Sequence, residues 1–300
     1  MENIVTDSNL LLVDAHCHLS VHPDEINPKT SIEHIFEKYV PNKKNLVLNV
    51  MTNSHKEHEI LLHNNIFKNS KYSNTKLGVG IHPWYCHRYT LKSHISKLEH
   101  YQEVLTFPSD ESGYLKNQII KKIDKFPDLI NINSIYSDDV FSLYNFVGEV
   151  GLDFSANILE LCDILDTRDV KVSSSHQINV LKFFIDKAVQ HSYVLSLHSV
   201  NARLDTYSTL KEYDDKLTSK LKIIFHSYSG TIEQFEQQYM KLQHIETYMS
   251  LSGYINLKEP LTKKSRKLIE KIDCSRILLE TDVPINTDEV FDFREIKRKL

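Results

Sequence analysis

The chain has 300 residues, of which 41% are hydrophobic and 25% charged, and its formal net charge is −4 at pH 7. This length allows a large buried core and is enough for one α/β barrel of ~250 residues with insertions. The acidic balance excludes a protein coated in basic residues, so any nucleic acid would be bound weakly, by a local patch or through a metal. No apolar run approaches the ~20 residues of a membrane span, and the first residues lack the pattern of a signal peptide.

The four cysteines are widely spaced and form no C-x-x-C pair. This spacing favours reduced thiols over a disulfide framework. We therefore expect a protein of the cytoplasm, the nucleus or both. The sequence leaves the oligomeric state open.

Eight short apolar runs alternate with longer segments of helical periodicity. The predicted strands are Leu10–His16, Asn45–Met51, Lys76–Ile81, Tyr144–Val150, Val194–His198, Lys222–His226, Glu246–Leu251 and Arg276–Glu280. Two of the predicted helices are Gln177–His191, with apolar residues at i, i+3 and i+4, and the Lys/Arg-rich Thr262–Ile272. The alternation predicts βα units and a parallel sheet, and eight strands close a barrel. We therefore predict an α/β fold of the TIM (β/α)8 type.

The segment between the third and fourth predicted strands is longer than one βα unit requires. Residues 107–139 contain polar, loop-like stretches around a helical piece at Leu115–Ile123. We expect a single barrel over residues 1–300 with an insertion at about 107–139. The insertion either covers the candidate site or is a peripheral elaboration, and the sequence favours neither.

His16 and His18 form a His-x-His pair at the end of the first run. Because side chains alternate along a strand, both imidazoles point to the same face. Four more metal-ligand residue types follow later strands: Glu149, His198, His226 and Asp282. Burying all six in one barrel mouth would cost many kcal/mol unless a cation compensates. The pattern therefore predicts a metal site.

Seven short motifs, taken in their order along the chain, indicate a resemblance to a known protein family. They are VDAHCH, GIHPW, GEVGLD, LHS, FHSYSG, LSG and LLETDVP, between about residues 11 and 285. In order and spacing they resemble the TatD-type metal-dependent hydrolases, deoxyribonucleases among the amidohydrolase-like TIM barrels. The segment around Ser175-His176-Gln177 is most similar to a fungal branch described as interacting with a subunit of the anaphase-promoting complex.

The resemblance implies two divalent ions, and the ligand types suit Zn²⁺, Mn²⁺ or Mg²⁺. It implies that His16, His18 and Asp282 hold the first ion, with Glu149 bridging. It further implies that His198 and His226 complete the second site. Asp282 would also accept a proton from the attacking water, so Asp282 and Glu149 are the expected catalytic residues.

Three further residues are expected to contact substrate. His82 resembles the histidine of the family's GIHPW motif and is assigned to the substrate phosphate. Trp84 either stacks on a base or packs at the rim. Many family members place an arginine shortly after the histidine of the fifth strand, and here it is displaced to Arg203.

The leading functional hypothesis is a metal-dependent deoxyribonuclease, a 3′→5′ exonuclease on DNA. The alternatives are an amide or ester hydrolase using the same two-metal site, and a protein-interaction scaffold that retains the barrel. The expected partners are DNA, which is bound weakly as substrate, and another protein. No association with a membrane is expected.

Overall fold

The computed structural model describes residues 11–19, 46–68, 73–108, 113–253, 255–258 and 260–285. Eight parallel strands form one sheet in the order β1-β2-β3-β7-β9-β10-β11-β12. They are β1 (Leu12–His18), β2 (Leu46–Met51), β3 (Thr75–Val79), β7 (Phe146–Asp153), β9 (Leu195–Val200), β10 (Leu221–Phe225), β11 (Ile245–Ser252) and β12 (Ile277–Glu280). Within the described residues, no helix is both long and apolar enough to cross a membrane.

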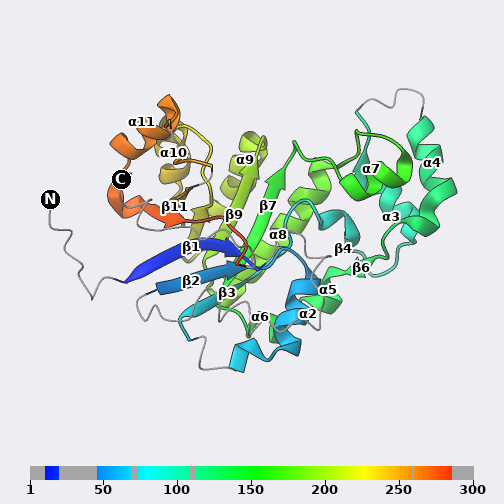
Figure 1. The fold of residues 1–300 in the computed structure, drawn as a ribbon, viewed down its shortest axis with the longest axis horizontal. Coiled ribbons are helices and arrows are strands. Elements are labelled where there is room, and N and C mark those ends of the chain that lie inside the picture. Colours follow the sequence, from blue (N-terminus) through cyan, green and yellow to red (C-terminus); the bar gives the residue numbers. More distant parts are fainter. Residues whose placement is uncertain are drawn as a thin grey trace.

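The sheet curls until its two ends approach each other (Figure 1). The residues after β12 return to β1, where the N–H of Ile285 donates to the carbonyl of His18 over 2.8 Å. The N–H of Asp282 likewise donates to the carbonyl of His16 over 3.0 Å. The architecture is therefore the expected α/β TIM barrel, nearly closed by hydrogen bonds to the residues that follow its last strand.

Helices connect successive strands of the sheet, as a βα architecture requires. They are α2 (His55–His63) after β2, α8 (Ser174–His191) before β9, α9 (Arg203–Asp214) after β9, α10 (Ile232–Gln237) after β10 and α11 (Lys263–Lys271) before β12. Single 3-10 turns lie at Ile66–Lys68, Cys86–Arg88, Ile123–Lys125, Tyr239–Lys241 and Cys274–Arg276.

A long excursion separates β3 from β7. It contains α3 (Lys97–Val104), α4 (Tyr114–Lys122), α5 (Ile132–Ile135), α6 (Asp138–Phe141) and the two-residue strands β4 (Tyr89–Thr90), β5 (Leu105–Thr106) and β6 (Ile130–Asn131). Two elements after β7, α7 (Leu159–Leu165) and β8 (Lys171–Val172), complete this region, and β8 pairs with β5. Helices and strands outside the barrel thus begin before residue 107, where the insertion at 107–139 was expected to start. The helix α4 lies where the sequence predicted a helical piece, at Leu115–Ile123.

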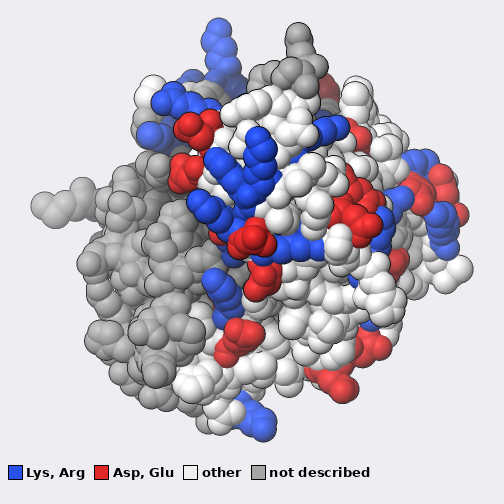
Figure 2. All heavy atoms as spheres, turned by 90° about the vertical axis from the view of Figure 1, so that its right-hand side faces the viewer, with Lys and Arg blue, Asp and Glu red and all other residues white. Residues whose placement is uncertain are grey.

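The region of α3, α4 and α7 projects to one side of the barrel (Figure 1). On the molecular face that includes it, acidic and basic side chains are interspersed (Figure 2). Ion pairs such as Lys97–Asp128 and Lys187–Asp138 join them. This face therefore carries no large surface of a single sign.

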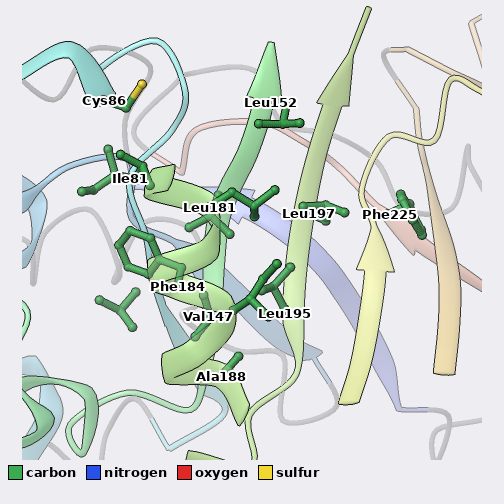
Figure 3. Packing of buried hydrophobic residues seen from close by; sticks show 14 of the residues in the cluster. Ile81, Cys86, Val147, Leu152, Leu181, Phe184, Ala188, Leu195, Leu197 and Phe225 are labelled. Carbon is green, nitrogen blue, oxygen red and sulfur yellow. The ribbon is translucent and has the colours of Figure 1, made fainter. Parts of the chain in front are cut away.

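The core between sheet and helices is built from the predicted periodicities. Leu181, Phe184 and Ala188 follow helical spacing along α8, and all three are fully buried. They pack over Val147 of β7 and Leu195 of β9 (Figure 3). This packing fixes α8 across the two strands that carry the central site residues.

All eight predicted strands are present, with bounds that differ by a few residues. β7 and β9 continue past their predicted ends because Asp153 still pairs with Val200. Glu149 and His198 therefore lie within strands rather than at their ends. β1 is shifted two residues toward His18, and the predicted start at Leu10 lies outside the described residues.

Candidate metal centre

The mouth of the barrel, formed by the carboxyl ends of the sheet strands, gathers the six predicted ligand residues. β1 presents His16 and His18 on one face, as strand alternation requires. A side chain at Gly151 would collide with the backbone carbonyl of His198, so this glycine allows β7 and β9 to lie close together. Strand geometry thus brings residues far apart in the sequence to one site.

Glu149 lies between two pairs of histidines. Its Oε1 atom is 2.6 Å from Nδ1 of His198 and 2.6 Å from Nε2 of His226. Its Oε2 atom is 3.6 Å from Nε2 of His16 and 3.5 Å from Nε2 of His18. Each oxygen of this one buried carboxylate therefore faces its own pair of imidazoles.

Asp282 adds a second carboxylate on the side of His16 and His18. Its Oδ1 atom lies 3.2 Å from Nε2 of His18 and 4.0 Å from Nε2 of His16. Its Oδ2 atom accepts a hydrogen bond of 3.0 Å from the Ser227 hydroxyl. The carboxylate is thus anchored on one oxygen and directed at the histidines with the other.

This donor set fits divalent cations. Nε2 of His16 and Nε2 of His18 are 3.2 Å apart, and Nδ1 of His198 is 2.9 Å from Nε2 of His226. The buried Oε2 atom of Glu149 has no hydrogen-bond partner among the described residues. Converging nitrogen lone pairs and an unpartnered carboxylate oxygen are what a bound cation would satisfy, and imidazole with carboxylate suits transition metals.

Burial and charge oppose each other at these groups. Burial alone would raise the pKa of Glu149, but the surrounding histidines, His226 foremost, hold it well below its usual range. Burial alone would lower the pKa of His226, but the charge of Glu149 raises it well above its ordinary value. The centre therefore keeps its carboxylates ionised and attracts positive charge.

The two histidines of β1 are also held from outside the centre. The outer nitrogen of His16, Nδ1, lies 2.9 Å from the hydroxyl of Ser196. Nδ1 of His18 lies 3.3 Å from the side-chain amide of Asn53. Polar groups on the outer nitrogen fix the orientation of an imidazole ligand, so Nε2 of each ring is directed inward.

The other two histidines face carboxylates with their outer nitrogens. Nε2 of His198 is 3.5 Å from Oδ2 of Asp153, and Nδ1 of His226 is 3.7 Å from Oε1 of Glu280. Glu280 is fully buried and also accepts from the N–H of Ser227 over 2.6 Å. A carboxylate behind an imidazole raises its basicity as a ligand.

These outer residues were missed by the sequence analysis. Glu280 carries a detectable signal, because it is a carboxylate within a predicted apolar strand. The same signal marks Asp14, which accepts hydrogen bonds from the N–H and the hydroxyl of Thr281. Asp14 thereby fixes the residue before Asp282. Ser196 and Asn53 carry no comparable signal.

His82 approaches the centre on the side of His198. Its Nε2 atom is 3.5 Å from Oε1 of Glu149. The backbone N–H of Trp84 donates to Nδ1 of His82 over 3.2 Å, which places the proton of the neutral ring on Nε2. Burial lowers the pKa of His82 to about 3, so the ring is neutral near pH 7. His82 therefore presents an N–H donor, rather than a lone pair, to the centre.

Trp84 and Arg203 lie at the rim of the mouth. The indole N–H of Trp84 donates to Oδ2 of Asp153 over 2.8 Å, while 45% of the residue stays exposed. Arg203 begins α9 and lines a small pocket that also includes His226. The structure thus brings all three predicted substrate residues to the mouth, at the edge of the cluster.

A TIM barrel whose mouth holds four histidines and one carboxylate around a second, shared carboxylate defines a barrel hydrolase of the metal-dependent class. The model of the family described as TatD related DNase matches residues 13–299. The chain belongs to this family, and the predicted resemblance is confirmed.

Two curated proteins are similar over most of their length. One is an uncharacterized deoxyribonuclease of Saccharomyces cerevisiae, 28% identical over 290 residues, covering 93% of this chain and 85% of the relative. The other is Cut9-interacting protein scn1 of Schizosaccharomyces pombe, 23% identical over 315 residues, covering 90% and 86%. Among solved structures, an uncharacterized amidohydrolase from Saccharomyces cerevisiae matches with a TM-score of 0.53 at 19% identity, covering 91% of this chain and 75% of that one. The structural match supports the fold.

Proposed function

We propose that this protein is a deoxyribonuclease that hydrolyses phosphodiester bonds with two divalent cations, Mg²⁺, Mn²⁺ or Zn²⁺, at the barrel mouth. The observation that carries the proposal is Glu149, whose two oxygens face two separate pairs of histidines. His16, His18 and Asp282 would hold one cation and His198 and His226 the other, with Glu149 shared. The bound ions would supply Lewis-acid stabilisation of the phosphoryl oxygens.

Two residues act on the substrate in this proposal. Asp282 accepts the proton of the attacking water, since its pKa is held below the usual range despite burial, by His18 above all, and it is therefore ionised. His82 donates a hydrogen bond from its Nε2–H to a non-bridging phosphate oxygen, which stabilises the charge that develops there. Trp84 provides an exposed aromatic face at the rim for a base.

The test is hydrolysis by purified protein reconstituted with each metal in turn. The substrates are single-stranded DNA labelled at either end, an RNA and a panel of acyl amides and esters. We expect cleavage of DNA from the 3′ end. Cleavage of the acyl compounds alone would instead establish the amide or ester hydrolase, since the same centre can attack a carbonyl.

The similarity to a Cut9-interacting protein favours a second candidate, a protein-binding scaffold. A scaffold would bind a Cut9-type protein after metal removal and in the His16→Ala, His18→Ala double variant. If that binding persists while no metal supports DNA cleavage, the nuclease proposal is wrong for this chain.

A further inference from the structure

The interior of the barrel contains a cavity at the end opposite the mouth. The interior of a TIM barrel is normally filled by layers of side chains. Here a volume of about 230 Å³ stays open among residues from β2, β3, β7, β9 and β10, several of them at the amino ends of these strands. None of the six predicted metal ligands is among the described residues that line it. The cavity is therefore separate from the candidate metal centre.

The direction of the lining side chains follows from strand alternation. Val147 of β7 and Leu195 of β9 pack against α8 on the outer face of the sheet (Figure 3). Their neighbours Phe146 and Ser196 are therefore turned to the interior, where both line the cavity. The cavity thus lies inside the barrel and not between the sheet and its helices.

The upper end of the cavity lies directly below the metal centre. Met51 and Ser196 line it there. A Cβ atom at Gly148 would lie 2.8 Å from Cβ of Ser196 and 2.9 Å from Sδ of Met51, so the backbone of β7 packs on both side chains. The Ser196 hydroxyl lies 2.9 Å from Nδ1 of His16. One side chain thus separates the cavity from a predicted metal ligand.

The lower end of the cavity carries a positive charge. Of the nine described residues that line the cavity, only Lys76 is charged. Its ammonium donates to the backbone carbonyl of Ser73 over 3.3 Å and has no acidic partner in the part of the chain that the structure describes. Asn145 lines the same end and is hydrogen-bonded to Leu77, the residue after Lys76. An ammonium beside a side-chain amide is suited to a carboxylate.

We propose that this cavity binds a small carboxylic acid with an apolar body, which enters from the end opposite the mouth. The walls between the two ends include Phe146, Val194 and Ile224, which offer apolar surface to such a body. An apolar cavity of about 150 Å³ binds benzene, so the larger volume here also accommodates a carboxylate substituent. The proposal goes beyond the proposed function and does not depend on it, since it requires neither metal nor DNA.

The test uses the methionines as probes. The chain has four methionines, and among the described ones Met51 alone lines this cavity. Protein with isotopically labelled methionine methyl groups is titrated with phenylacetate in EDTA and followed by NMR, and Met51→Leu assigns the signal. The Met51 signal should shift and saturate with a dissociation constant on the order of 1 mM or lower. The signals of Met240, which lies at a different hollow, and of Met249, which is buried in β11, should stay unchanged.

Two substitutions test the two ends of the ligand. Lys76→Gln should weaken phenylacetate binding about fivefold and leave binding of the neutral phenylacetamide unchanged. Lys220→Gln is the matched control, because Lys220 is also exposed and donates to a backbone carbonyl, that of Gln243, but does not line the cavity. Val194→Phe fills the cavity and should abolish the shift of the Met51 signal. If Val194→Phe does not fold, the comparison of Lys76→Gln with Lys220→Gln still decides.

Four outcomes would overturn the proposal. They are a Met51 signal that does not shift saturably, a shift confined to Met240, equal loss of affinity in Lys76→Gln and Lys220→Gln, and equal affinity of wild type for phenylacetate and phenylacetamide. Binding that appears only after metal is added would place the carboxylate on the ions at the mouth, which also contradicts the proposal. Because every readout is independent of hydrolysis, a failed nuclease assay overturns the proposed function without affecting this site.

Discussion

Two groups of buried histidines in this protein differ in what their ring nitrogens face. At the mouth, the inner nitrogens of His16, His18, His198 and His226 face one another and Glu149. A second group lies around the start of α8, where every imidazole contacts a backbone carbonyl. Nε2 of His176 lies 2.9 Å from the carbonyl of Cys86, Nε2 of His100 lies 2.9 Å from that of His87, and Nδ1 of His87 lies 3.0 Å from that of Trp84.

The comparison shows that burial does not distinguish a ligand from a structural histidine, whereas the bonding partner does. A carbonyl only accepts, so a nitrogen that contacts it carries the proton and is satisfied. Burial lowers the pKa of His176 to about 4, and this group is therefore neutral and stable without an ion. The facing lone pairs at the mouth are not satisfied in this way, so of these two groups the mouth is the one that a cation would complete.

The largest expected effect tests the shared carboxylate. Glu149→Gln removes the charge that faces both histidine pairs, and metal affinity should fall by more than about 100-fold, beyond the effect of losing an outer contact. Metal content after dialysis, measured by plasma mass spectrometry, provides the readout. His176→Gln is the matched control in the second group and should retain its metal. Equal metal content in both variants would remove the distinction between the groups.

The second prediction concerns the proposed proton acceptor. Asp282→Asn keeps the volume but removes the charge, and DNA hydrolysis should fall by roughly 10²-fold or more with the fold intact. Initial rates at saturating metal measure the loss of hydrolysis, and the circular dichroism spectrum shows whether the fold is intact. Near wild-type turnover would rule out the role assigned to Asp282.

The third prediction concerns stability in the second group. His176→Ala leaves the buried carbonyl of Cys86 without its donor, so the free energy of unfolding should fall by about 1–3 kcal/mol. Urea denaturation measures this loss. The proportion of bound metal should not change, and a variant that loses metal would show that His176 also supports the mouth.

The smallest expected effect is the pH dependence of the difference in unfolding free energy between wild type and His176→Ala. The folded pKa of His176, about 4, lies below the unfolded value, so the unfolded state binds the proton first and stability is lost as pH falls below about 6.5. Protonation of His176 in the unfolded state should therefore lower the free energy of unfolding of wild type by about 1 kcal/mol between pH 6.5 and 5.5. Since His176→Ala lacks this loss, its stability difference from wild type should narrow by that amount in urea titrations with EDTA. A constant difference would contradict a neutral His176.

Much of the fold was predictable because local patterns determine it. Apolar runs gave all eight strands, and helical spacing gave α8 and α11 within a few residues. The ends of β7 and β9 were misplaced because pairing between them extends to Asp153 and Val200, which are not part of an apolar run. Strand ends depend on the partner strand as well as on local composition.

The sequence by itself determined the directions of side chains and the chemistry they carry. The His-x-His spacing placed His16 and His18 on one face, and the metal-ligand residues after later strands indicated one mouth. Only the tertiary structure decided which groups hold these residues, such as Asp14 hydrogen-bonded to Thr281 and Ser196 beside His16. The reason is physical: alternation along a strand is a local property. Contacts between distant residues depend on strand order, register and the packing of the connecting helices.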